Sequence, residues 1–368
     1  MQSYTTKEEL LELYNKPLLE LVFEAATVHR LHHNPLEVQM SSLLSIKTGG
    51  CPEDCGYCPQ AARYHTDVDA QKMMTVESVL EQARNAKANG SSRLCMGAAW
   101  REIRDNKDFD SVVEMVQGVN DLNMEVCCTL GMMNENQAKR LKNAGLFAYN
   151  HNLDTSKDYY DDVISTREYE DRLNTIDNAR KAGISVCSGG IIGMGEAIED
   201  RVGLLMSYME MENPPESIPI NALVAVEGTP LSEQKPIEQW EMIRMVATTR
   251  IAFPKSVVRL SAGRTQMNME AQAMCFMAGA SSIFAGDKLL TTPNPDFNED
   301  KEMFKILGLT AKASFADGEQ PVSKPDAIID ARKEKEAKRA AELKAAREKL
   351  EIEGKTDFQP RKVVSSSN

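Results

Sequence analysis

The sequence predicts an α/β fold in which eight parallel strands, with helices between them, close into a (β/α)8 barrel of the TIM type. Three observations lead to this prediction: helical and strand-like stretches alternate along most of the chain, several helical stretches end in a glycine followed directly by an apolar run, and the connections are short. Alternation of this kind favours a parallel sheet with right-handed crossovers, and eight units favour closure. A doubly wound open sheet is the alternative.

Glycines that follow helical stretches help to locate the strands. Glycine readily adopts the left-handed conformation that ends a helix, and four glycines here precede a short β-type run. They are Gly90, Gly145, Gly183 and Gly279. The strands are expected over residues 39–47, 92–97, 125–130, 146–150, 185–189, 217–224, 256–260 and 282–285, with amphipathic helices such as 76–89 and 169–182 between them.

Three regions divide the chain: an N-terminal helical extension over 1–38, the barrel over 39–317 and a tail over 318–368. The extension is expected to form helices that cap the barrel. His29, His32 and His33 lie close to its end, where they could hold a metal ion, although a solvated surface role is favoured. The tail is rich in alanine and charge with few large aliphatic residues, which is typical of a lone charged helix or a disordered segment.

Charge and composition limit the classes of function. A net charge of −12 disfavours binding to nucleic acid or to an anionic membrane surface. No apolar run approaches the roughly 18 residues that a membrane-spanning helix needs. The amino-terminal residues lack the patterns of a secretory signal or a transit peptide, so a cytoplasmic location is expected. In that reducing compartment, clustered cysteines bind metals more often than they form disulfides.

Three cysteines follow the first predicted strand in the loop TGGCPEDCGYCPQ. Cys51, Cys55 and Cys58 lie within eight residues of one another, and glycines and prolines allow the loop to curl around one point. A structural zinc site would need a fourth ligand, but the next cysteine, Cys95, is 37 positions away. Three thiolates on one loop match a 4Fe-4S cluster that leaves one iron open to another ligand.

The other cysteines are sorted by the alternation of side chains along a barrel strand, where every second residue faces the interior. Leu94 and Met96 suit the helix layer, so the residue between them faces inward, and the same reasoning turns four polar residues inward from four strands. They are Cys95, Cys127, Cys187 and Arg259. Each could be an ordinary buried residue, but together they predict a second metal–sulfur site. Cys128 and Cys275 are expected only to pack.

Two further segments could contact a ligand. YNHNLDTS at 149–156 follows the fourth strand and presents Asn150, Asn152 and Asp154 on one alternating face, at the rim where barrel active sites lie. SGGIIGMGE at 188–196 follows the fifth strand and opens the next helix, and its glycines let the backbone approach a ligand closely. An Asx-turn loop and a plain tight turn are the respective alternatives.

The cysteine loop resembles the CxxxCxxC signature of radical S-adenosylmethionine (SAM) enzymes. Together with CMGAAW, YNHNLDT, VCSGG, INALV, VRLSAGR, QAMCFMAGA and KLLTTPNP, it makes residues 5–315 similar to the biotin synthase family. The resemblance implies a sulfurtransferase that converts dethiobiotin to biotin, using 5′-deoxyadenosyl radicals from SAM and sulfide from a 2Fe-2S cluster. It further implies a homodimer that receives electrons from a flavodoxin-type donor.

The resemblance also assigns roles to residues. Because the cofactors carry the chemistry, no side chain is expected to act as catalytic acid, base or nucleophile. The ligands of the 4Fe-4S cluster are Cys51, Cys55 and Cys58, and those of the 2Fe-2S cluster are Cys95, Cys127, Cys187 and Arg259. The SAM contacts are Tyr57, Asn152, Asp154 and the turn from Ile191 to Glu196. The contacts to the ureido ring of dethiobiotin are Asn150 and Asn221.

Two alternatives remain open. One is another radical SAM enzyme, such as a lipoyl synthase or a diiron-hydrogenase maturase, although a lipoyl synthase needs further cysteines near its N-terminus and residues 1–50 contain none. The other is a non-catalytic Fe-S carrier or redox sensor. A cluster deep inside a barrel suits such a protein poorly, because its iron could not be handed on.

Overall fold

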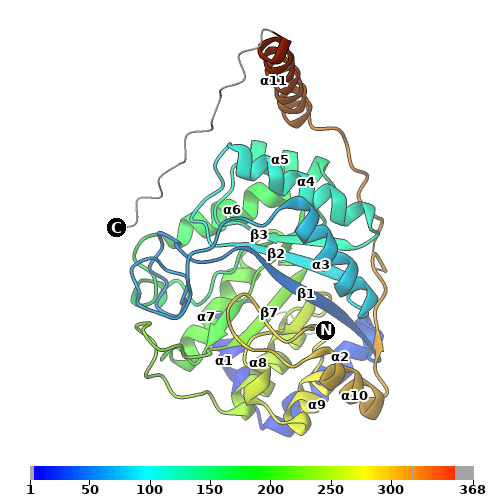
Figure 1. Cartoon of the computed structure of the whole chain (residues 1–368). Coiled ribbons are helices and arrows are strands. Elements are labelled where there is room, and N and C mark those ends of the chain that lie inside the picture. The colour runs from blue at the N-terminus through cyan, green and yellow to red at the C-terminus, as the bar shows by residue number, and fades with distance from the viewer. Residues whose placement is uncertain (1–3, 317, 353–368) are drawn as a thin grey trace. The chain divides into compact units, whose positions relative to one another are not determined.

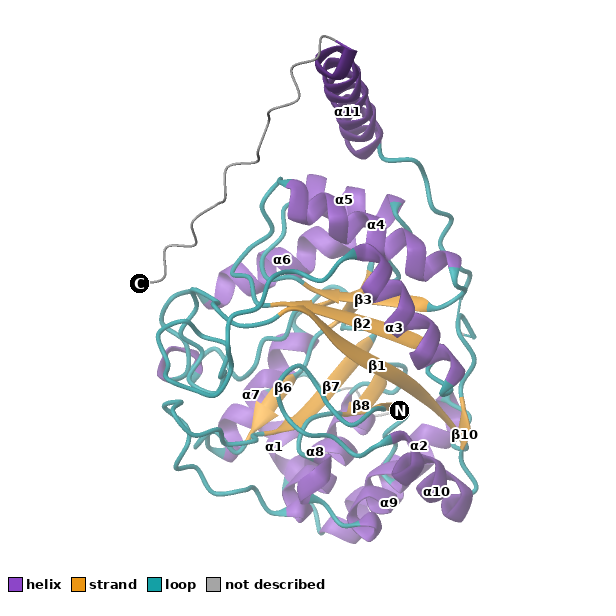
Figure 2. Cartoon of the chain, in the orientation of Figure 1, coloured by secondary structure: helices purple, strands orange, loops and turns teal. Residues whose placement is uncertain are grey.

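The chain is described here by a computed structural model that covers residues 4–316 and 318–352. Its strands are β1 (Glu37–Lys47), β2 (Arg93–Ala98), β3 (Glu125–Thr129), β4 (Ala148–Asn150), β5 (Ser185–Cys187), β6 (Gly190–Ile192), β7 (Ser217–Ala222), β8 (Val257–Leu260), β9 (Ser282–Phe284) and β10 (Thr310–Ala311). Neighbours pair in parallel in the order β1-β2-β3-β4-β5-β7-β8-β9, and β9 pairs back to β1 (Figure 2). The sheet therefore closes, which confirms the barrel; the doubly wound sheet is wrong.

Helices alternate with these strands and surround the barrel (Figure 1). They are α3 (Val76–Ala88), α4 (Lys107–Asp121), α5 (Glu135–Asn143), α6 (Tyr169–Lys181), α7 (Ile198–Met209), α8 (Gln239–Ala252), α9 (Met269–Met277) and α10 (Phe297–Leu307). The expected glycine ends of α3, α5, α6 and α9 are confirmed, since the glycine after each has a positive φ between 72° and 103°. Side chains such as Thr75, Asn106 and Asn134 accept hydrogen bonds at helix starts, which satisfies free N–H groups.

The fifth barrel strand is longer than predicted. β5 and β6 pair with β7 in one continuous register, with Cys187 opposite Ser217 and Gly190 opposite Ile220. Between the two halves Gly189 lies so close to β7 that a Cβ there would be 2.0 Å from the carbonyl oxygen of Pro219, so only glycine fits. The segment predicted as a turn therefore begins as strand.

The N-terminal extension forms α1 (Lys7–Tyr14) and α2 (Leu18–His32), which pack on the outer helices α7, α8 and α9. Only its end, at His32 and His33, reaches the amino-terminal opening of the barrel. The solvated role expected for the histidines is wrong for His29. Its ring is 1% exposed, and burial lowers its pKa to about 3.

The barrel unit continues beyond the predicted boundary, to Lys324, and a second unit begins at Pro325. Residues after 317 still belong to the first unit because Asn120 of α4 donates to the Pro321 carbonyl at 2.9 Å and to Ser323 Oγ at 3.0 Å. The second unit contains the charged helix expected for the tail, α11 (Ala327–Ile352). The rest of the tail, 353–368, lies outside the described residues. Within the described residues, none of the helices has the length and apolar character to cross a membrane.

Candidate active site

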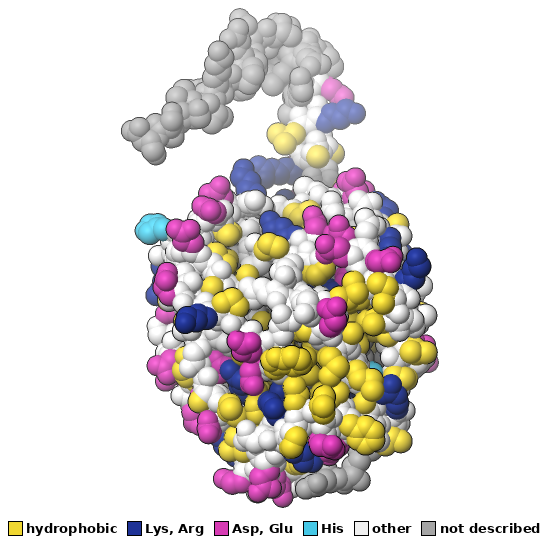
Figure 3. Space-filling view, turned by 90° about the horizontal axis from the view of Figure 1, so that it is seen from below, with side chains coloured by type: hydrophobic (Ala, Val, Ile, Leu, Met, Phe, Trp, Pro, Cys, Tyr) yellow, Lys and Arg dark blue, Asp and Glu magenta, His cyan; other side chains and the backbone are white. Residues whose placement is uncertain are grey.

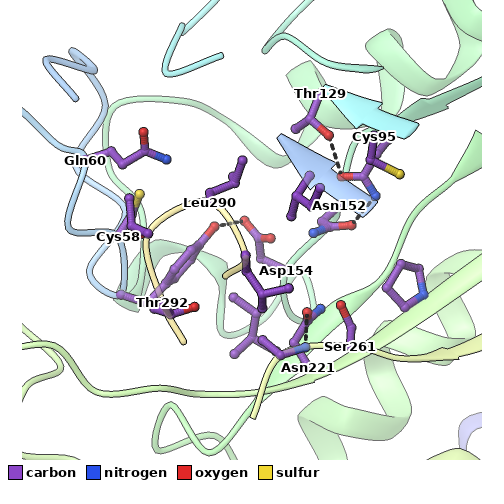
Figure 4. A pocket seen from close by; sticks show the side chains of 18 of the residues that line it. Cys58, Gln60, Cys95, Thr129, Asn152, Asp154, Asn221, Ser261, Leu290 and Thr292 are labelled. Atoms are coloured by element: carbon purple, nitrogen blue, oxygen red, sulfur yellow. Dashed lines mark hydrogen bonds between the residues drawn. The ribbon is translucent and has the colours of Figure 1, made fainter. Parts of the chain in front are cut away.

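A cavity of about 320 Å³ runs from the carboxyl ends of the strands to the barrel centre (Figure 4). It is lined by most of the predicted site residues, which come from segments far apart in the sequence. They are Cys51, Tyr57, Cys58, Cys95, Cys127, Asn150, Asn152, Asp154, Ile191, Asn221 and Arg259. Figure 4 shows Cys58 and Cys95 on opposite sides of the cavity, with Asp154 and Asn152 between them. Cys55, Cys187 and Glu196 do not line it.

The cysteine loop is held in a fixed curl by its own backbone. Cys51 N donates to the Gln60 carbonyl at 2.9 Å, and Ala62 N donates to the Cys51 carbonyl at 2.8 Å. The loop enters through Gly49, whose φ is +68°, and a Cβ there would lie 2.9 Å from the Ala70 backbone. This curl brings Cys51 and Cys58 to the cavity wall. Cys55 does not line the cavity and is buried, with 7% of its surface exposed.

Two carboxylates latch this loop to neighbouring segments. Asp54 accepts hydrogen bonds from the backbone N–H groups of Ser165 and Thr166 at 2.9 and 3.1 Å, and Glu53 pairs with Arg101 at 3.0 Å. Although partial burial opposes the effect, the hydrogen bonds from Ser165 and Thr166 lower the pKa of Asp54 to about 2. The loop is therefore tied to the segment that follows β4, independently of any metal.

Burial affects the protonation of the three thiols in the cysteine loop. Burial raises the pKa of Cys55 to about 11 and that of Cys58 to about 12, and it also raises the pKa of Cys51. Such thiols stay protonated at neutral pH unless a bound metal displaces the proton. Nowhere in the described part of the chain are three His, Cys, Asp or Glu side chains arranged to hold a single metal ion. Cysteines of a cluster each bind a different iron and need not converge.

A second group of thiols lies deeper in the barrel. Cys95 and Cys127 are direct neighbours in the β2–β3 register and pack with Ala148, and both they and Cys187 are at most 3% exposed. The hydrogen bond with Cys127, and then the guanidinium groups of Arg259 and Arg93, lower the pKa of Cys95, although burial raises it. A stabilised thiolate beside buried thiols is the donor set that iron binds.

Arg259 enters this thiol group from β8 and is 1% exposed. Its guanidinium donates to Ser282 Oγ at 2.9 Å and to Ser41 Oγ at 3.3 Å, and its Cζ lies 4.6 Å from the centre of the Phe284 ring. Among the described residues, its hydrogen-bond partners are the neutral side chains of Ser282, Ser41 and Gln39, so its positive charge acts on the neighbouring thiol of Cys95. Cys128 and Cys275 are fully buried on the helix side and do not line the cavity.

A band of amides lies between the two groups of cysteines. Asn150 Nδ2 donates to Asn152 Oδ1 at 3.1 Å and to Cys187 Sγ at 3.3 Å, while its Oδ1 accepts from Thr129. Asn221 Nδ2 donates to the Gly190 carbonyl at 2.9 Å. These bonds fix the orientation of the amides at the cavity wall and present both donors and acceptors to a ligand.

Asp154 is held by two side chains, Tyr57, which the sequence predicted as a site residue, and Arg172, which it did not. Its Oδ2 accepts from the Tyr57 hydroxyl at 2.8 Å and pairs with Arg172 at 2.5 Å, and both charged side chains are at most 4% exposed. Arg172 lies on α6 on the same face as the buried Tyr169 and Ile176. An arginine at a core-facing position of an amphipathic helix was the signal that could have identified it.

Replacing Arg172 by Met should lower the free energy of unfolding by about 3–5 kcal/mol, because Asp154 would remain buried without its cation. Urea unfolding measures this change. The matched control is Arg180→Met on the same helix, whose partner Glu216 is half exposed, and a loss of at most about 1 kcal/mol is expected there. Equal losses in the two variants would contradict a structural role for the buried pair.

Other residues that line the cavity were not predicted from the sequence. Glu196, which was predicted as a SAM contact, does not line it. The loop Leu289–Thr292 after β9 folds into the cavity mouth, and buried His151 lines the wall with no hydrogen-bond partner at Nε2. The Glu196 carboxylate accepts from Gly193 N at 2.9 Å and pairs with Arg201 at 2.7 Å, so it holds the turn before α7 rather than facing the cavity.

Two family models match the chain. Residues 45–207 match the radical SAM superfamily, and residues 219–310 match the biotin and thiamin synthesis associated domain. The first match covers the cysteine loop, Asn150 and Asn152, and the second covers Asn221 and Arg259.

Similar proteins cover nearly the same span. A biotin synthase of Christiangramia forsetii is 66% identical over 86% of this chain and 88% of its own length, and the mitochondrial biotin synthase of Arabidopsis thaliana is 58% identical over 83% and 82%. Among solved structures, methylornithine synthase has a TM-score of 0.71 at 19% identity, covering 84% of this chain and 94% of that chain. The FeFe-hydrogenase maturase HydG from Carboxydothermus hydrogenoformans has a TM-score of 0.72 at 16% identity, covering 84% and 76%. Likenesses at this identity concern the fold alone.

Proposed function

The chain belongs to the biotin synthase family of radical SAM enzymes, and from this premise we propose how the residues of its cavity divide the work of converting dethiobiotin to biotin. The enzyme is a sulfurtransferase that uses SAM and a 4Fe-4S cluster. The observation that carries the assignment of residues is that two separate sets of cysteines flank one cavity, with a band of amides and a carboxylate between them.

Cys51, Cys55 and Cys58 hold the 4Fe-4S cluster. Their loop is curled before any metal binds, and their thiols need a metal to lose their protons. The inner set of Cys95, Cys127, Cys187 and Arg259 would hold a 2Fe-2S cluster, with the three cysteines as thiolate ligands and Arg259 as a nitrogen ligand that gives up a proton of its guanidinium when iron binds. When bound, the first cluster supplies the electron that cleaves SAM, and the second supplies the sulfur atom.

SAM lies against the outer half of the cavity. Asp154, paired with Arg172 and oriented by Tyr57, would accept hydrogen bonds from the ribose hydroxyls, and Asn152 would contribute beside it. Ile191 packs on the adenine from the strand end. Glu196 acts on this contact indirectly, because it fixes the turn that follows Ile191.

Dethiobiotin lies in the inner half, between SAM and the inner cysteines. Its ureido ring has two N–H donors and a carbonyl acceptor, and the amides of Asn150 and Asn221 offer the complementary groups. The hydrogen bond from Asn150 to Cys187 Sγ brings this recognition next to the inner thiols. The loop Leu289–Thr292 covers the mouth and excludes water and other hydrogen donors from the reaction.

Anaerobic reconstitution tests this assignment. The reduced enzyme, incubated with SAM and dethiobiotin, is expected to yield biotin, and Mössbauer spectroscopy is expected to find one 4Fe-4S and one 2Fe-2S cluster per chain. Zinc, or a single type of cluster in the intact protein, would contradict the two-cluster assignment. A redox sensor would hold both clusters but release no 5′-deoxyadenosine.

The electron donor is a flavodoxin-type protein, and the enzyme works in the cytoplasm. Arg63 lies at the edge of the cysteine loop, 3.5 Å from Asp54, and its side chain is half exposed, so its guanidinium is accessible to a carboxylate of a small acidic redox protein. The eight free cysteines and the oxygen-sensitive clusters suit a reducing compartment.

The enzyme is a homodimer that associates through the outer face of α2. Leu19, Phe23 and Leu31 lie on one side of this helix and are 73%, 69% and 68% exposed, and hydrophobic side chains gather on this side of the molecule (Figure 3). An exposed apolar row of this kind marks an interaction site.

Phe23→Glu is therefore expected to shift the protein to a monomer in sedimentation velocity, because a carboxylate would be buried without a partner in the interface. Val322→Glu is the matched control, since Val322 is 80% exposed and lies outside α2. A Phe23→Glu protein that remains dimeric would assign the interface to another surface.

A further inference from the structure

A second cavity, of about 640 Å³, lies at the opposite end of the barrel. It is lined by the starts of the strands and by the ends of the helices that precede them, whereas the proposed substrate cavity is lined by their carboxyl ends. Its wall includes Arg93, Glu125, Ser185, Ser217 and Val257. Nothing in the proposed chemistry of SAM or dethiobiotin uses this opening.

The second cavity is separated from the inner cysteines by one layer of side chains. In a strand, residues two apart face the same side and are about 6.6 Å apart along the strand. Each proposed ligand of the inner cluster has a residue of the second cavity two positions before it in the sequence. Arg93, Glu125, Ser185 and Val257 precede Cys95, Cys127, Cys187 and Arg259 in this way. Each of these four strands therefore runs from a residue at the floor of the second cavity to a proposed ligand of the inner cluster.

This floor is polar and contains an unpaired group. Ser217 lies opposite Cys187 in the strand register and is 4% exposed, and its Oγ has no hydrogen-bond partner among the residues that the structure describes. A buried hydroxyl without a partner normally binds water or a ligand. Arg93, whose guanidinium lies beside the thiols, pairs with Glu125 at 2.6 Å, and Gln39 Nε2 donates to the same carboxylate at 2.9 Å.

A segment from beyond the last barrel helix also contacts this floor. Phe315, beyond the last barrel helix, donates its backbone N–H to Glu125 at 2.9 Å, and its ring packs on Phe147 with 5.8 Å between ring centres. Phe315 has a φ of +58°, which is unfavourable for a bulky residue. Release of this segment would free one oxygen of Glu125 and loosen its hold on Arg93.

We propose that the amino-end cavity is the entry for inorganic sulfide, which passes through the Arg93–Glu125 layer to the inner cysteines as hydrosulfide, releases its proton to water in the cavity and replaces the sulfide given to the product. The sulfur keeps its oxidation state in this step, and a one-electron acceptor removes the two electrons that the formation of the product leaves on the irons. The guanidinium of Arg259, which contacts the neutral side chains of Ser282, Gln39 and Ser41, favours a small anion such as hydrosulfide on the inner side of this layer, whereas Arg93 is paired with Glu125. Entry from this end does not require SAM or the product to leave the other cavity. The inference rests on the proposed inner cluster.

Refilling of the inner cluster in the full-length enzyme tests the passage. The loaded enzyme is allowed one turnover, and ferrous salt, sodium sulfide and a one-electron oxidant that returns the iron to the ferric state are then added while SAM and biotin remain saturating. The return of the visible 2Fe-2S absorption is followed with time. Ser185→Trp, which fills the floor beneath Cys187, should slow this return by at least about tenfold while leaving its final amplitude unchanged. Val257→Trp, which narrows the same floor from β8, should reproduce the slow return.

Thr292→Trp is the matched control, because it adds the same bulk at the mouth of the substrate cavity, and refilling at the wild-type rate is expected. Wild-type rates in both Ser185→Trp and Val257→Trp, or slow refilling in Thr292→Trp alone, would overturn the passage and leave the cluster assignment intact. A wild-type protein that never shows 2Fe-2S absorption would contradict the proposed inner cluster itself. The two failures are therefore distinguishable.

Discussion

Replacing Cys51 by Ala is expected to abolish both the cleavage of SAM and the formation of biotin. The described cysteines outside this loop lie on β2, β3, β5 and α9, so none of their thiols can take the place of Cys51. With two of the three proposed ligands left, the 4Fe-4S cluster would not be retained, and no electron would reach SAM. Liquid chromatography of 5′-deoxyadenosine and biotin after anaerobic incubation measures both products.

Cys275→Ala provides the comparison for this variant. Cys275 is fully buried on α9, away from the cavity, and its removal costs only packing. Both activities should persist in Cys275→Ala. If Cys51→Ala retained SAM cleavage while its iron content stayed at the wild-type level, the assignment of the outer cysteines would be wrong.

Replacing Cys187 by Ala is expected to separate the two activities. The outer cysteines, Tyr57 and Asp154 would be untouched, so SAM cleavage and some 5′-deoxyadenosine should remain. Biotin should not form, because the inner site would lack one of four ligands and the sulfur it supplies. The same chromatography applies, and Mössbauer spectra should retain the 4Fe-4S signal and lose the 2Fe-2S signal.

Cys128→Ala is a close control for that separation. Cys128 is as buried as Cys187 but faces the helix layer beside Cys127, so the change removes a similar volume without removing a proposed ligand. It should form biotin. Equal loss of both products in Cys187→Ala and Cys51→Ala would contradict the division of roles between the two sets of cysteines.

Features that depend on short-range rules could be predicted from the sequence. The alternation of side chains along a strand correctly turned Cys95, Cys127 and Arg259 toward the interior, where all three line the cavity. The helix-ending glycines located the strand starts for the same reason, since their conformation is set by local sterics.

Features that depend on distant partners could not be predicted in this way. β6 exists because Gly189 lets the fifth strand approach Pro219, about 30 residues away in the sequence, which a turn-like composition conceals. Burial of Arg172 depends on Asp154, and the fold of Leu289–Thr292 into the mouth depends on the shape of the whole barrel. The burial of His29 likewise follows from packing of α2 on α8.

The latch formed by Asp54 with Ser165 and Thr166 has a consequence for repair after oxidative damage. A loop whose shape is set by hydrogen bonds within the protein loses its conformational entropy when the chain folds, and little more when iron arrives. If oxygen strips the iron, the three cysteines stay arranged as a template. Iron and sulfide can then rebuild the cluster without refolding of the loop, so exposure to air would inactivate the enzyme reversibly.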